Sequence, residues 1–223
     1  KAGEVTLRIQ DMKNKGAIAP SYVADIVVAD DLNLSSISQV YKNGKLVCEN
    51  GKALFECETV DNSKVTNTVH LPKISADFFK TDVKDKFDAI ELIPESIITK
   101  KVTVSYSDSL SKVCVIERHH NLGTKGIGFV TNYGITNGAI ATSIGHDSHN
   151  VIVIGDNDSD MALAVNTLGT SGGIAVCSEG KVIASMTLDI AGLMSVKSAA
   201  EVTREHDNLY SAAKVLNITD KID

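Results

Sequence analysis

Short apolar segments separated by turns run through residues 1–60, a pattern typical of β-strands. Residues 24–30 (ADIVVAD) form a short apolar run closed by acidic residues. Residues 39–48 (QVYKNGKLVC) place Asn43 and Gly44 between two apolar arms. Both central residues of a type I′ turn need a positive φ, which Asn and Gly tolerate best. The pattern therefore predicts a β-hairpin with its turn at this dipeptide.

The polar run at residues 61–64 (DNSK) indicates a boundary, and the signal between there and residue 106 is mixed. It predicts a strand near residues 65–71, a polar turn or helix near 75–86 and a strand at 101–106.

After residue 107, apolar segments of strand length alternate with polar or Gly-rich loops and with helical patterns. The predicted strands span residues 112–120, 127–135 and 151–155, with a hairpin of 174–177 and 181–188, whereas residues 138–145 (GAIATSIG) fit either a closely packed strand or a helix. Ser159 is expected to cap a helix over residues 160–168, and a long amphipathic helix is expected to start near Ser195. The predicted fold class is therefore mixed α/β (α+β): a small β-sandwich segment over residues 1–60, followed over 61–223 by a layered mixed sheet with helices.

Composition and charge argue against nucleic acid and membranes as partners of this chain. The 223 residues are 43% hydrophobic and 22% charged, as in soluble globular proteins. The 22 Lys and Arg against 28 Asp and Glu give a net charge of −6, and the basic residues are dispersed, so nucleic acid is not expected as a partner. No run approaches the ~20 apolar residues that span a bilayer, and no secretory signal core is visible, so we expect a cytoplasmic protein without a membrane partner.

Two polar clusters carry groups suited to chemistry. The first is residues 146–150 (HDSHN), just before a strand, where His146 and His149 offer near-neutral acid–base groups that Asp147 can orient. The second is residues 117–120 (ERHH) at a strand end, where alternation would place Glu117 and His119 on one face. The alternative interpretations are a polar turn whose histidines cap backbone groups and an ordinary charged strand end.

A third cluster is acidic. Residues 151–161 (VIVIGDNDSDM) resemble the magnesium motif of haloacid-dehalogenase-type phosphatases, and carboxylates after a strand suit a hard cation. That family also needs an Asp-x-Asp pair on an earlier strand, whereas Asp30 and Asp31 are adjacent. The alternative, which we favour, is that Asp156, Asp158 and Asp160 cap amide donors at a strand-to-helix turn.

Taken together, these segments resemble the C-terminal part of bacterial adenine deaminases, in the amidohydrolase superfamily. The matching stretches are residues 16–28 (GAIAPSYVADIVV), 40–47 (VYKNGKLV), 117–120 (ERHH), 138–143 (GAIATS), 146–150 (HDSHN) and 191–195 (AGLMS). The chain departs from the family at Ser21, where a glycine is usual after Ala-Pro, and this questions the geometry of that turn.

The resemblance implies hydrolysis of adenine to hypoxanthine and ammonia by hydroxide bound to a divalent metal, Mn or Fe. In such enzymes the metal ligands belong to a (β/α)₈ barrel of ~250 residues, which we expect upstream of Lys1. This chain has no His-x-His pair, so no metal or other cofactor is expected in it. It is accordingly expected to be a C-terminal fragment, inactive alone, in which residues 1–60 are the end of the barrel region and the sandwich segment, and 61–223 the C-terminal domain.

The expected partners are adenine, the barrel of the same protein and further copies of the chain in a homo-oligomer. Supporting roles in catalysis, holding the purine or moving protons at the barrel mouth, are assigned to His146, Asp147, His149, Glu117 and His119. Two alternatives stay open: a non-catalytic structural or oligomerisation domain, and a magnesium-dependent phosphatase-like domain.

Overall fold

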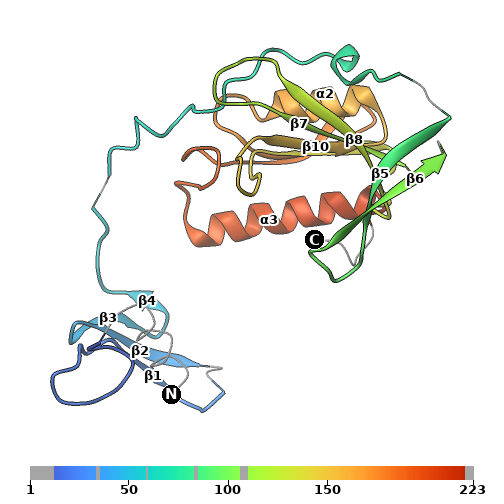
Figure 1. The fold of residues 1–223 in the computed structure, drawn as a ribbon. Coiled ribbons are helices and arrows are strands. Elements are labelled where there is room, and N and C mark those ends of the chain that lie inside the picture. Colours follow the sequence, from blue (N-terminus) through green and yellow to red (C-terminus); the bar gives the residue numbers. More distant parts are fainter. Residues whose placement is uncertain (1–12, 34–35, 59, 83–84, 106–109, 219–223) are drawn as a thin grey trace. The chain divides into compact units, whose positions relative to one another are not determined.

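The computed structural model describes residues 13–33, 36–58, 60–82, 85–105 and 110–218. The chain forms two compact units, Lys1–Val60 and Asp61–Asp223 (Figure 1). Within the described ranges, no helix combines the length and the apolar character needed to cross a membrane.

The first unit carries one antiparallel sheet in the order β1 (Ile26–Ala29), β2 (Ile37–Lys42), β3 (Lys45–Glu49) and β4 (Lys52–Ala53). The predicted hairpin is confirmed: Asn43 and Gly44 join β2 to β3 with φ of 50° and 76°. Ser21 has a φ of 68°, in the left-handed region that glycine adopts without the steric cost of a Cβ.

The second unit is built on an eight-stranded sheet in the order β12-β11-β9-β10-β7-β8-β5-β6. Every pairing is antiparallel except that of β5 with β8, and this mixed sheet with two α-helices confirms the α+β prediction. The elements are η1 (Ala76–Phe79), β5 (Lys86–Leu92), β6 (Thr99–Ser105), β7 (Ser111–Ile116), β8 (Lys125–Thr131), β9 (Gly138–Thr142), β10 (Val151–Gly155), α2 (Asp158–Thr167), β11 (Gly173–Ser178), β12 (Lys181–Thr187) and α3 (Ala199–Val215).

Two apolar cores lie on opposite faces of this sheet, each covered by one helix (Figure 1). Because side chains of a strand alternate between faces, Val153 of β10 packs in the core under α2, whereas its neighbour Ile154 packs in the core under α3. Met161 of α2 and Leu216 beyond α3 are fully buried in their respective cores. Around β10 the sheet is thus covered on both faces, which explains why this strand is a continuous apolar run.

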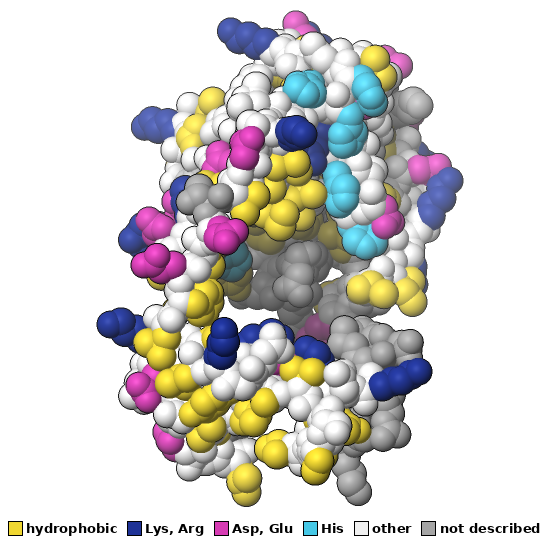
Figure 2. Space-filling view, turned by 90° about the vertical axis from the view of Figure 1, so that its left-hand side faces the viewer, with side chains coloured by type: hydrophobic (Ala, Val, Ile, Leu, Met, Phe, Trp, Pro, Cys, Tyr) yellow, Lys and Arg dark blue, Asp and Glu magenta, His cyan; other side chains and the backbone are white. Residues whose placement is uncertain are grey.

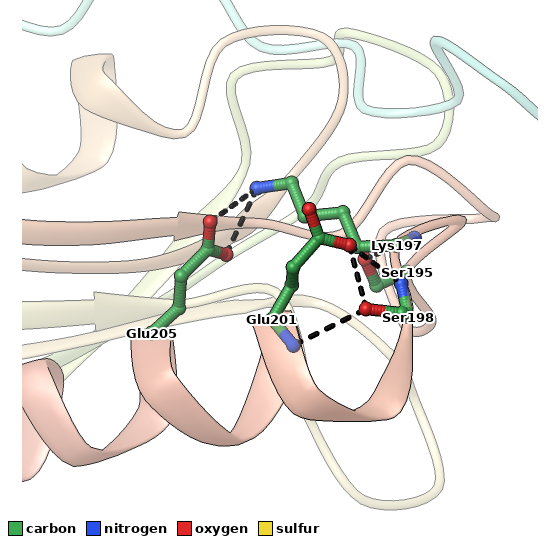
Figure 3. A network of polar contacts seen from close by, with 5 residues as sticks. All are labelled: Ser195, Lys197, Ser198, Glu201 and Glu205. Atoms are coloured by element: carbon green, nitrogen blue, oxygen red, sulfur yellow. Dashed lines mark hydrogen bonds and ion pairs between the residues drawn. The ribbon is translucent and has the colours of Figure 1, made fainter. Parts of the chain in front are cut away.

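Helix α3 begins four residues later than its sequence pattern suggested, because Ser198 caps it. The Ser198 hydroxyl accepts a hydrogen bond from the Glu201 amide at 3.4 Å, and the Glu201 carboxylate accepts one from the Ser198 amide at 3.0 Å (Figure 3). This reciprocal capping box lowers the pKa of Glu201, chiefly through its bonds to Ser198. Lys197 adds an ion pair with Glu205, at 2.6 Å, on the next turn.

The structure corrects several sequence predictions. Residues 65–71 form no strand: the buried Val69 and its neighbour His70 make single backbone bonds, to Thr170 at 3.0 Å and to Arg118 at 2.7 Å, instead of a ladder. Helix α2 is capped by Asn157, whose side chain accepts from the Asp160 amide at 2.8 Å, so Ser159 lies within the helix. Residues 138–145 contain a strand, β9, and strand β5 was not predicted.

Candidate functional site

Three loops lie at one end of the second sheet, and two of them contain the histidine clusters. Register places the end of β7 beside the start of β10, with Ile116 opposite Val151. It also places the end of β9 beside the starts of β10 and β11, and the end of β12 beside the start of β11. The loops that follow or join these strands, residues 117–124, 143–150 and 188–194, are called the loop end below. The chain therefore gathers segments that are more than 70 residues apart in sequence at one end of the sheet.

Glu117 holds the first of these loops. One carboxylate oxygen accepts hydrogen bonds from the amides of His119 at 2.5 Å and His120 at 2.8 Å, and the other accepts from Leu122 at 3.1 Å. Partial burial alone would raise the pKa of Glu117, but these backbone bonds outweigh it and lower the pKa below its ordinary value. The carboxylate thus stabilises a turn, and its charged form is the one that the turn requires.

This arrangement makes the loop sensitive to acid. Because the pKa of Glu117 is lower in the folded loop than in the unfolded chain, its contribution is complete above the ordinary pKa of 4.5 and is lost as pH falls through the lowered value. We expect the amides of His119, His120 and Leu122 to exchange hydrogen faster below about pH 4.5, as measured by hydrogen–deuterium exchange corrected for the intrinsic pH dependence. A Glu117→Gln variant should show the faster exchange already at pH 7. Equal protection in both proteins at pH 7 would contradict this role.

His119 joins the first loop to the second. Its Nε2 lies 3.1 Å from the carbonyl oxygen of Ser148, while the rest of the side chain is exposed. The chain turns immediately after Ile116, so Glu117 and His119 do not share a strand face as the alternation suggested. Glu117 instead contacts His119 through the backbone.

The second loop presents His146, Asp147 and His149 outward. The Nδ1 of His146 lies 3.2 Å from Asp147, and the two side chains are 95% and 89% exposed. Asp147 and His149 both have positive φ, 64° and 51°, which gives the loop its tight course. The side chain of His149 is exposed too, whereas its carbonyl points inward. Figure 2 shows histidine side chains gathered on one face of the second unit.

Arg118 and Ser143 are the residues of this region that sequence reasoning did not select. Arg118 is 2% exposed, and its guanidinium donates from Nε to the carbonyl of His149 and from Nη2 to that of Ala191, the latter at 3.0 Å. Burial lowers its pKa. Ser143 is fully buried, donates to the Gly192 carbonyl at 2.6 Å and accepts from the Gly173 amide at 2.7 Å. Both lie in motifs that carry the family resemblance, ERHH and GAIATS, and this resemblance is the signal in the sequence that could have indicated them.

The three carboxylates of the acidic run after β10, Asp156, Asp158 and Asp160, make hydrogen bonds or ion pairs within the second unit. Asp156 accepts from the amides of Asn137 at 2.5 Å and Gly138 at 2.9 Å. Asp158 forms an ion pair with Lys112. Asp160, which is 2% exposed, accepts from the Gly180 amide at 2.8 Å and from the Asn157 side chain at 2.9 Å. The capping interpretation is therefore correct only in part: Asp156 and Asp160 accept from backbone amides, but these amides belong to neighbouring turns, and Asn157 caps α2. Because all three carboxylates have partners, the contacts weigh against a magnesium-dependent phosphatase.

The described residues do not fit the divalent metal that the resemblance implies. Across those ranges, no three side chains of His, Cys, Asp or Glu are grouped so that they could hold a metal ion. His146 and Asp147 make a pair, and His119 contacts a backbone carbonyl.

Comparison with known proteins agrees with the motifs. The family model of the adenine deaminase C-terminal domain matches residues 91–222. The chain is 39% identical over 221 residues to adenine deaminase 2 of Carboxydothermus hydrogenoformans, and this match covers 93% of the chain and 39% of the relative. It is 40% identical to the adenine deaminase of Clostridium acetobutylicum and 35% identical to that of Lysinibacillus sphaericus, covering 38% of each.

The chain thus spans about two-fifths of the length of these relatives. The family match begins within β5 and includes all three loops of the loop end. Because this match covers more than half of the chain, the chain belongs to the adenine deaminase C-terminal domain family.

Proposed function

We propose that this chain is the C-terminal part of a cytoplasmic adenine deaminase that hydrolyses adenine to hypoxanthine and ammonia. The observation that carries the proposal is the match to relatives named adenine deaminase over about nine-tenths of the chain. The family model supports it over the second unit, which holds the loop end.

In this proposal the metal, Mn or Fe, is bound by a barrel that precedes the chain. Such a metal supplies activated water at neutral pH. The relatives extend over about three-fifths of their length beyond the match, which leaves room for a barrel. Adenine and that barrel would be the partners of the chain.

The chain's own contribution would come from the loop end. His146 and His149 are exposed on a loop whose backbone is held by buried contacts, so their imidazoles are presented to a partner surface on a fixed support. Imidazole can donate a hydrogen bond to a purine nitrogen or carry a proton toward the leaving ammonia. His119, tied to the same loop through Ser148, offers a third such group.

The test uses the complete enzyme with adenine as substrate and measures hypoxanthine and ammonia. We expect the His146→Ala/His149→Ala double variant to lose at least about tenfold in kcat/KM, the low side of what a positioned acid–base group contributes. His206→Ala is the matched control, because His206 is an exposed histidine on α3, outside the loop end, and should keep the wild-type rate.

Two results would go against the proposal in different ways. Unchanged kcat/KM in the double variant would assign the histidines a structural role and favour the non-catalytic alternative. Absence of adenine turnover by the wild-type complete enzyme would overturn the deaminase assignment itself.

A further inference from the structure

We infer that Arg118 is a positioning residue: its guanidinium holds the loops at residues 143–150 and 188–194 in the arrangement that the reaction uses. The inference rests on the proposed function for its catalytic part. Its structural part, that one side chain fixes both loops, rests on the contacts alone.

Arg118 is bonded to three segments at once. Its Nε donates to the carbonyl of His149, and its Nη2 donates to the carbonyl of Ala191. Its own carbonyl accepts from the amide of His70. His149 lies 31 residues and Ala191 73 residues away from Arg118 in sequence, so its side chain links two distant loops. The bond from Ser143 to the Gly192 carbonyl is a second link between them.

The guanidinium is buried without a carboxylate partner among the described residues, and its Nη1 makes no hydrogen bond there. A buried charge is costly unless it is paired or fully hydrogen-bonded. An apolar side chain of similar size would avoid this cost if the position only needed filling. Two carbonyl bonds from one planar fork are what arginine provides and an apolar residue does not.

Gly192 lies directly beside the Arg118 guanidinium, at a position where a larger residue would overlap it. A Cβ on Gly192 would lie 2.2 Å from Nη1 of Arg118, and Gly192 has a φ of 69°. The Gly192 carbonyl is held in turn by Ser143, at 2.6 Å. A Cβ on Gly172 would lie 2.6 Å from the Ser143 hydroxyl, so the close packing continues through both neighbours. The Arg118 guanidinium, the Ser143 hydroxyl and Gly192 therefore form one closely packed group of buried polar contacts at the loop of residues 143–150.

The first arm of the test asks whether Arg118 holds the loops. Arg118→Lys and Arg118→Met are made in the complete enzyme, and hydrogen–deuterium exchange is measured over residues 143–150 and 188–194. We expect exchange in both segments to rise at least about tenfold, with α3 unchanged; Arg204→Met, an exposed site on α3, is the control. Unchanged exchange in either segment would overturn the inference.

A further variant leaves the Arg118 side chain in place and is compared with a matched glycine control. Gly192→Ala pushes on Nη1, whereas Gly180→Ala has nearly the same positive φ, 76°, and no atom within 4 Å of its new Cβ. We therefore expect Gly192→Ala to reproduce the faster exchange and Gly180→Ala to leave both loops protected.

The second arm separates positioning from mere stability. For protein that circular dichroism shows to be folded, we expect kcat at saturating adenine to fall at least about tenfold in Arg118→Lys and Gly192→Ala, and to stay near wild type in Gly180→Ala. Faster exchange with unchanged kcat would overturn the positioning role and leave a structural one. If the wild-type enzyme does not turn over adenine, the proposed function fails, while the exchange arm still decides what Arg118 holds.

Discussion

Replacing Gly138 by alanine is expected to destabilise the second unit by about 3 kcal/mol or more, the upper part of the range for overpacking a core. A Cβ at this position would lie 2.2 Å from the carbonyl oxygen of Cys177 and 2.7 Å from Leu216. The carbonyl belongs to β11, which is paired to β9, so it cannot move away without disturbing the ladder between these two strands. Urea unfolding followed by circular dichroism measures the change in free energy.

Gly126→Ala is the matched control for this substitution. Gly126 also lies in a strand of the same sheet, β8, but nothing lies within 4 Å of its added Cβ and its φ is not positive. The change should be within about 1 kcal/mol of zero and can be stabilising, since alanine restricts the unfolded chain. Equal effects of the two substitutions would show that β9 and β11 do not approach as closely as described.

The second large effect is expected at Asp160. Its carboxylate is buried and accepts from the Gly180 amide, between β11 and β12, and from the side chain of Asn157, the N-cap of α2. Asp160→Ala therefore leaves the Gly180 amide without its acceptor and removes one of two acceptors of the Asn157 side chain, which also donates to Asp156. Losing a buried acceptor in this way costs about 2 kcal/mol. Thermal unfolding should therefore show a lower Tm, whereas Asp207→Ala, at an exposed site on α3, should change little.

The same experiment distinguishes a structural role of the acidic run from a magnesium site. If Asp156, Asp158 and Asp160 only make the structural contacts described above, millimolar Mg²⁺ leaves the Tm of the wild-type protein unchanged. A rise in Tm with Mg²⁺ that Asp160→Ala abolishes would contradict the structural role and revive the phosphatase alternative.

The parts of the fold that the sequence predicted depend on local chemistry. The turn at Asn43 and Gly44 follows from the positive φ that both residues adopt, and β10 follows from an apolar run buried on both faces. Strand β5 was missed although it carries a usable signal: Phe87 and Ala89 are buried while Lys86 and Asp88 between and beside them are exposed. The fully buried Val69 lies in a segment that packs without pairing as a strand, which periodicity cannot distinguish.

The loop end was only partly predictable for a different reason. The sequence indicates His119, His146 and His149 because each belongs to a run of polar residues directly after or before a predicted strand. It does not show that Glu117 is committed to three backbone amides, nor that Arg118 is buried beneath a loop 31 residues away and a turn 73 residues away. These contacts depend on strand order in the sheet, in which β9 lies between β10 and β11. Strand order of this kind arises from packing over the whole unit.

If the loop end lies at the substrate of an adenine deaminase, a bound purine should protect it. Hydrogen–deuterium exchange of the complete enzyme, with and without saturating hypoxanthine, measures this protection, because the product binds without turnover. We expect slower exchange in residues 117–124 and 143–150 when hypoxanthine is bound, with α3 unchanged. Protection confined to other parts of the enzyme, with both loops exchanging as before, would contradict it.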